Sequence, residues 1–247
     1  MTTALWPDNQ SFQIGDVVVH KIVDCIEPTN PRFLYCDKQK EDFNPYLDWL
    51  QPHFLDEGKR MLLSIHAFVI VTDHHTVLVD TCVGNQKQAL AFSNWNGRQD
   101  SSFLDGLSAR GLSPQCIDYV LCTHMHLDHT GWNTRLVNGC WQPTFPNAKY
   151  LFSPKEWKHW ETADGPGDRA VVTQNIEPIF TAGQVEWVTG RWGIGDTVTL
   201  LPTPGHTPGH YSVQIKSKGD TGVITGDVIV NPVQIAEPSW NQIADED

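Results

Sequence analysis

The residues of this chain that could do chemistry gather in one short segment. Directly after the apolar stretch 117–122, the chain carries His124, His126, Asp128 and His129. Imidazole nitrogen and carboxylate oxygen both bind a borderline cation such as Zn²⁺, at roughly 2.0–2.2 Å. Side chains two positions apart on an extended segment point the same way, so two of these histidines can reach one point. Such a polar cluster offers no packing advantage, because leucine or valine would fill a core better. We therefore interpret it as a metal site.

Two later segments place the same residue types after predicted strands. His206 and His210 lie in a turn rich in proline and glycine that follows residues 197–201, and Asp227 follows residues 222–225. Prolines and glycines fix a tight turn, which can hold a histidine rigidly. Because side chains at strand ends converge on a rim, we expect both segments to lie near the first cluster.

The elements that must position these residues are read from apolar periodicity. Alternation predicts strands at 17–23, 64–71, 76–80, 117–122, 149–152, 185–188, 197–201, 211–215 and 222–225. Helical patterns cover 101–110, 154–161 and 168–180. This mixture favours layered α and β elements over an all-β barrel. No low-complexity tract or long linker divides the chain, so we expect a single domain over residues 1–247.

Composition narrows the function classes. Apolar residues make up 40% of the chain, which is typical of a globular protein. The formal charge is -12, and this negative charge disfavours nucleic acid as a partner. The longest apolar run, residues 67–71, is far below the roughly 18 residues of a membrane span. Residues 1–8 carry neither a basic leader nor an apolar core, so we expect a cytoplasmic protein without membrane contact.

Taken together, these motifs resemble the metallo-β-lactamase superfamily of metallohydrolases. The resemblance rests on the spacing of the cluster at residues 124–129, on the turn that holds His206 and His210, and on the dipeptide Gly226-Asp227. Asp80, after residues 76–79, looks like the family's early strand-end aspartate. The likeness runs from about residue 17 to residue 230. The residues around the cluster, from His126 to Asn133, are most similar to those of methyl parathion hydrolase and of quorum-quenching lactonases.

The resemblance implies a four-layer αβ/βα sandwich of two similar halves, with a dinuclear Zn²⁺ site at one sheet edge. It implies the first ion on His124, His126 and His206, the second on Asp128 and His129, and Asp227 bridging both. Asp80 would orient a ligand through a hydrogen bond. His210 is left over from its turn and is expected to be structural.

The reaction implied is hydrolysis of a small molecule. A metal-bound hydroxide would attack an ester, a lactone or a phosphotriester, with Asp128 as the catalytic residue that orients it and moves its proton. Thioester hydrolysis is the alternative within the superfamily. Diiron oxidoreductase relatives carry a glutamate in place of His126, and nuclease relatives are disfavoured by the acidic charge. The protein could also assemble as a homodimer.

One feature departs from the family pattern. The family supplies a further histidine to the second ion from beyond the bridging aspartate, whereas none of the 20 residues after Asp227 is a histidine. We therefore expect the C-terminal part of the fold to lack its final helix and strand, and the second metal to bind weakly. The non-catalytic alternative is a metal-poor remnant or fragment acting as a binding module.

Two regions allow more than one interpretation. Residues 28–58 hold four prolines among many aromatics, which fits either a lid or binding loop or a packed excursion. The tryptophans at positions 132, 157, 160, 187 and 192 could line an apolar pocket, although most tryptophans simply pack.

Overall fold

The fold is described from a computed structural model that covers residues 10–165 and 167–247. The segment 1–8, on which the expectation of no leader depends, lies outside the described residues. Among the helices of the described ranges, none combines the length and the apolar character needed to cross a membrane.

A seven-stranded sheet forms the larger part of the fold, in the order β1-β2-β3-β4-β5-β8-β9. Its strands are β1 (Ser11–Ile14), β2 (Val17–Thr29), β3 (Met61–Val71), β4 (Thr76–Val79), β5 (Tyr119–Leu121), β8 (Lys149–Phe152) and β9 (Val185–Trp187). The first four strands pair antiparallel, and β4, β5, β8 and β9 run parallel. The carboxyl ends of the parallel strands therefore meet at one edge.

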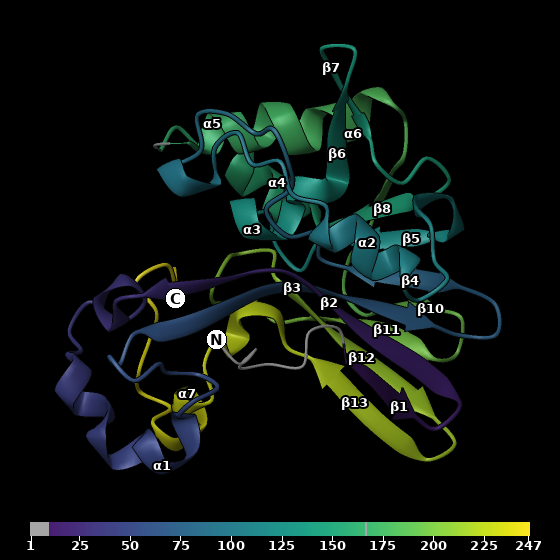
Figure 1. Ribbon diagram of the computed structural model, residues 1–247. Coiled ribbons are helices and arrows are strands. Elements are labelled where there is room, and N and C mark those ends of the chain that lie inside the picture. The colour runs from purple at the N-terminus through teal and green to yellow at the C-terminus, as the bar shows by residue number, and fades with distance from the viewer. Residues whose placement is uncertain (1–9, 166) are drawn as a thin grey trace.

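A second sheet of four antiparallel strands packs beneath the first (Figure 1). It consists of β10 (Trp192–Ile194), β11 (Val198–Pro202), β12 (Tyr211–Ser217) and β13 (Asp220–Ile224), and a separate hairpin joins β6 (Thr134–Val137) to β7 (Cys140–Pro143). Every strand that periodicity predicted is present. The short strands β1, β6, β7 and β10 were not predicted.

Helices cover the outer face of the first sheet in Figure 1. They are α2 (Ser102–Ser108), α3 (Leu127–Thr130), α4 (Pro154–Trp160), α5 (Asp168–Val171) and α6 (Glu177–Thr181), while α1 (Leu47–Leu50) and α7 (Val233–Ala236) lie apart from this layer. Short 3₁₀ turns occur at Pro31–Phe33, Lys40–Tyr46, Ser93–Trp95, Pro114–Cys116, Gly131–Asn133 and Gly226–Val228. The predicted helix 168–180 is interrupted by a π-helical stretch, Val172–Ile176.

Two hydrophobic cores hold the layers together. One lies between the helices and the first sheet, where Phe103 of α2 is fully buried with Ile22 of β2. The other lies between the sheets and joins Val19 to Leu200 and Val213. Burying such side chains stabilises the fold by about 1.5–3 kcal/mol each. The expected sandwich of mixed α and β layers is confirmed.

The proline-rich segment is a packed excursion that also reaches the site. Its side chains Tyr35 and Phe43 are fully buried, and both rings contact Trp240 near the C-terminal end. Phe33 and Leu34, from the same segment, line a cavity of about 670 Å³. Residues 28–58 are therefore a packed excursion, and their role as a lid or binding loop stays a prediction.

A close backbone approach holds the histidine-rich loop against the loop after β4. Gly131 donates its N–H to the Cys82 carbonyl at 2.7 Å. A Cβ added at Gly131 would lie 1.8 Å from the Val83 carbonyl oxygen, so only glycine fits here. This contact fixes the loop that follows β5.

The substitution Gly131→Ala tests that contact. It forces the two loops apart and should lower the free energy of unfolding by about 1–3 kcal/mol or more, measured by urea denaturation. Gly193→Ala is the matched control, because its added Cβ would meet nothing closer than 3.4 Å. Equal stability of the two variants would contradict the close packing described.

Candidate metal centre

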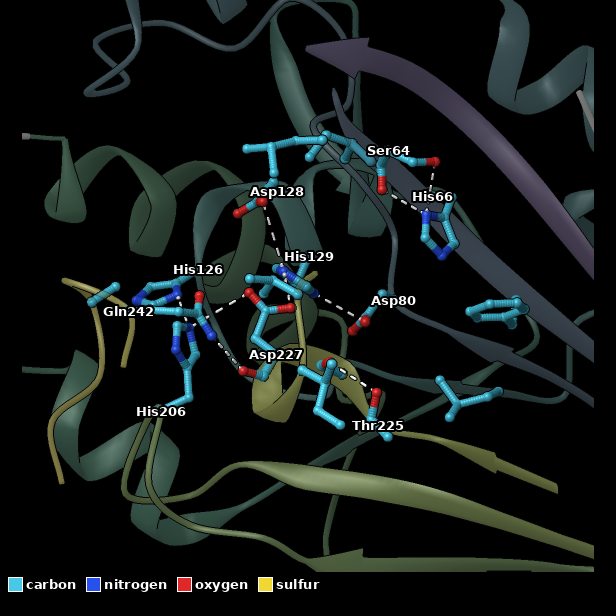
Figure 2. A pocket seen from close by; sticks show the side chains of 18 of the residues that line it. Ser64, His66, Asp80, His126, Asp128, His129, His206, Thr225, Asp227 and Gln242 are labelled. Carbon is cyan, nitrogen blue, oxygen red and sulfur yellow. Dashed lines mark hydrogen bonds and ion pairs between the residues drawn. The ribbon is translucent and has the colours of Figure 1, made fainter. Parts of the chain in front are cut away.

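Three histidines from the two sheets converge on one point. His124 and His126 follow β5 of the first sheet, and His206 follows β11 of the second. The Nδ1 atom of His126 lies 2.8 Å from Nε2 of His124 and 3.0 Å from Nε2 of His206. Figure 2 shows His126 and His206 next to each other, and their rings meet edge to face.

The imidazoles of His124 and His126 are neutral electron-pair donors. His124 is fully buried, and burial, followed by the neighbouring His129, holds its pKa well below the usual range. Burial and the nearby His206 lower the pKa of His126 to about 3. Ring nitrogens this close, on neutral rings, fit a bound cation of the Zn²⁺ class, which prefers imidazole ligands.

A second group of ligand atoms adjoins the first through Asp227. Its Oδ2 atom lies 3.6 Å from Nε2 of His206 and 3.9 Å from Nε2 of His124. Its Oδ1 atom lies 3.4 Å from Nε2 of His129, which in turn lies 3.7 Å from Oδ2 of Asp128. The two carboxylate oxygens of Asp227 therefore face the two groups separately, as a bridging ligand would.

Negative charge is concentrated around His129. Burial alone would lower the pKa of this imidazole, but the carboxylates of Asp227, Asp80 and Asp128 outweigh burial and hold it well above the usual range. Burial raises the pKa of Asp128. Three acids around one ring favour a cation at this position, which is the charge a second metal ion would supply.

Asp80 orients the ring of His129, as predicted. Its backbone has a positive φ of 62°, which turns the chain sharply after β4. The carboxylate accepts hydrogen bonds from the Thr123 backbone N–H at 2.7 Å and from Nδ1 of His129 at 3.0 Å. With its proton on Nδ1, His129 presents Nε2 to the site.

His210 has a structural role. Its Nδ1 atom lies 2.8 Å from the Thr203 hydroxyl, and its Nε2 atom accepts the backbone N–H of Asp227 at 3.1 Å. Both ring nitrogens are used inside the protein, so this histidine holds the bridging aspartate in place instead of binding an ion.

Sequence reasoning missed Glu156, which joins the two histidine loops. This buried carboxylate accepts four hydrogen bonds. Oε1 takes the Met125 N–H and the Trp160 indole N–H, both at 2.9 Å. Oε2 takes the Thr207 hydroxyl at 2.7 Å and the Gly209 N–H at 3.0 Å. No local pattern distinguishes Glu156 from other acids on a helix.

The C-terminal segment contributes further contacts that were not predicted. Asp245 accepts a hydrogen bond from Nδ1 of His206 at 2.8 Å, which leaves Nε2 of that ring free for a ligand. Gln242 donates to the backbone carbonyl of Asp227 at 2.8 Å. The structure folds this acidic stretch against the turn that carries His206, through backbone hydrogen bonds to the Gly205 carbonyl.

A cavity of about 670 Å³ opens onto the metal centre. His126, Asp128, His129, His206 and Asp227 stand at one part of its wall, and most of the remaining lining is apolar. None of the five tryptophans considered from the sequence lines this cavity, so that interpretation is wrong. The tryptophan in its wall is Trp95, which sits on the loop after β4.

The substitution Glu156→Gln tests how the loops are held together. The side-chain NH₂ of the glutamine is a donor and would face the donors that Glu156 now accepts from. We therefore expect a loss of about 2–3 kcal/mol in the free energy of unfolding and at least tenfold weaker Zn²⁺ binding. Binding is measured by competition with a chelating dye. Glu161→Gln, at an exposed position just past the same helix, is the control and should behave as the parent chain. Unchanged affinity in Glu156→Gln would refute this role.

The substitution Asp245→Ala tests the contact to His206 separately. Losing the acceptor frees the ring to rotate and to change tautomer, so Zn²⁺ affinity should fall about 10–100-fold. Glu246→Ala, which removes only an exposed ion pair with His159, serves as the comparison. If both variants bind Zn²⁺ equally, Asp245 does not position His206.

The sequence has recognisable relatives. The sequence model of the Metallo-beta-lactamase superfamily matches residues 60–244. N-acyl homoserine lactonase AttM of Rhizobium radiobacter is 29% identical over 123 residues, which cover 48% of this chain and 43% of that protein. The match thus spans less than half the length of this curated relative.

Solved structures share the fold at low sequence identity. A probable metal-dependent hydrolase from Staphylococcus aureus is 21% identical with a TM-score of 0.76, covering 95% of this chain and 81% of that one. AidC, a dizinc quorum-quenching lactonase in complex with a product, is 19% identical with a TM-score of 0.75, covering 97% and 81%. Because the superfamily model matches well over half of the chain, this protein belongs to the metallo-beta-lactamase superfamily.

Proposed function

We propose that the chain is a metal-dependent hydrolase of lactones and related esters that carry an apolar chain. The observation that carries this proposal is the convergence of His124, His126 and His206 beside Asp227 at the wall of a large apolar cavity. A Lewis-acidic centre next to an apolar cavity suits a substrate with one polar reacting group and a hydrophobic tail.

The proposed ligands are those expected from the sequence, with Zn²⁺ as the ion. They are His124, His126 and His206 for one ion, Asp128 and His129 for a second, and Asp227 between them. When bound, Zn²⁺ makes water more acidic and polarises a carbonyl oxygen. The ring nitrogens of His124, His126 and His206 lie close enough together to hold one ion, and a second set of close ligand atoms joins His129 and Asp227 to His124. Asp128 adjoins that second set, with its Oδ2 atom 3.7 Å from Nε2 of His129.

Asp128 is the proposed proton carrier. Its carboxylate lines the cavity beside His129, and burial raises its pKa, so the group can take up a proton at Oδ2 more readily than a surface aspartate. From that position it would orient the attacking water, accept its proton and return the proton to the leaving oxygen. The hydrogen bond from Nδ1 of His129 to Asp80 keeps the His129 ring fixed beside Asp128 during this transfer.

The cavity favours neutral substrates. Asp80, Asp128 and Asp227 all contribute to its wall, and in the absence of bound cations they repel anionic groups. Apolar side chains such as Phe33 and Phe92 offer contact to a hydrocarbon chain. Among the neutral classes considered, the relatives named N-acyl homoserine lactonases support lactones over phosphotriesters and thioesters.

Turnover of N-hexanoyl homoserine lactone by the zinc-loaded chain tests the proposal. We expect hydrolysis that a chelator abolishes and added Zn²⁺ restores. His124→Ala should lower kcat/KM about a thousandfold, since a metal centre supplies several kcal/mol of transition-state stabilisation. His74→Ala, at an exposed turn position, is the control.

Binding of the lactone without any turnover would instead favour the metal-poor binding module. Turnover that survives both the chelator and His124→Ala would overturn the metal mechanism itself.

A further inference from the structure

His66 is a polar side chain in the cavity wall that the proposed mechanism does not use. It lies on β3 between Ser64 and Phe68, and side chains at these alternate positions face the cavity together. The rings of His66 and Phe68 contact edge to face, with their centres 5.0 Å apart. Figure 2 shows His66 on the far side of Asp80 from the histidine cluster.

The tautomer of His66 follows from its contact with the backbone. Nδ1 lies 2.6 Å from the Ser64 carbonyl oxygen, which can only accept a hydrogen bond, so Nδ1 carries the proton. Burial, followed by the charge of Lys21, lowers the pKa of His66 to about 3. The ring is therefore neutral, and Nε2 is a bare acceptor.

This acceptor has no partner among the described residues. Both hydrogen bonds of the ring, to the Ser64 carbonyl and hydroxyl, are made by Nδ1. Figure 2 shows the other ring nitrogen turned away from Ser64. Around it the cavity wall is mainly apolar, so a ligand that fills the cavity would remove water from Nε2. Desolvating an acceptor without a replacement donor weakens binding.

We propose that His66 is a specificity-determining residue whose Nε2 accepts a hydrogen bond from an N–H group of the substrate. That N–H lies farther from the candidate metal centre than the hydrolysed group, because His66 lines the same cavity as His129 and Asp227 but stands on the far side of Asp80 (Figure 2). The inference rests on the proposed function and deepens it. A secondary amide N–H has the required chemistry, whereas a plain alkyl lactone offers no donor.

The test uses two lactones of the same shape. One is N-hexanoyl homoserine lactone, and the other is its carbon analogue, in which CH₂ replaces the amide N–H. We expect His66→Phe, which keeps an aromatic ring but removes the acceptor, to raise KM for the amide about 5–20-fold and to leave kcat within twofold. For the carbon analogue, KM should stay within twofold of the parent value.

Two controls separate recognition from folding. His74→Phe makes the same replacement at an exposed turn and should change neither KM. Melting temperature and zinc content of His66→Phe should match the parent chain. Equal effects of His66→Phe on both lactones, or no effect on either, would overturn the proposal.

A binding measurement keeps the inference testable if the chain hydrolyses neither lactone. Calorimetric titration with the two corresponding lactams, which resist ring opening, gives Kd without turnover. We expect the parent chain to bind the amide lactam at least fivefold tighter than its carbon analogue, and His66→Phe to bind both alike. Absence of turnover with this pattern would refute the hydrolase but not the role of His66; equal binding by the parent chain would refute that role.

Discussion

One buried carboxylate links the two halves of the metal centre. The histidine loops follow β5 and β11, which belong to different sheets, and packing between the sheets brings them only roughly together. Glu156 is hydrogen-bonded to both loops, through Met125 on one side and through Thr207 and Gly209 on the other. Hydrogen bonds to an ionised and buried group are strong, and an unpaired donor there would be costly. A backbone hydrogen bond from the Tyr211 N–H to the Thr123 carbonyl, at 2.9 Å, joins the same loops, so the distances within the site depend on both contacts.

Charge is the second constraint on the site. His129 stands among Asp80, Asp128 and Asp227. The Asp80 carboxylate accepts the Thr123 backbone N–H, and the Asp227 backbone N–H donates to His210, which fixes the position of both acids. Such an arrangement of acids is unfavourable without compensating positive charge. The imidazolium of His129 supplies part of that charge. A cation bound at Nε2 would take the place of the proton on that nitrogen. The same acids underlie the preference for neutral substrates that we propose.

The sequence predicted the parts of the site that are local. His124, His126, Asp128 and His129 follow one strand, so their spacing alone indicates how they point. The ends of predicted strands also located Asp80, His206 and Asp227. Glu156 and Asp245 could not be found this way, because each binds loops that are far away in the sequence. The π-helical interruption at Val172–Ile176 and the short strand β10 were missed for a related reason, since packing outweighs local preference there.

The most direct measurement is anomalous diffraction at the zinc absorption edge from crystals of the zinc-loaded chain. The account predicts a strong peak at roughly 2.0–2.2 Å from Nε2 of His124, Nδ1 of His126 and Nε2 of His206, with an oxygen of Asp227 nearby. A second peak between Asp128, His129 and Asp227 would complete the dinuclear site. Zinc found only elsewhere on the protein, with these three rings hydrogen-bonded to water, would contradict the account.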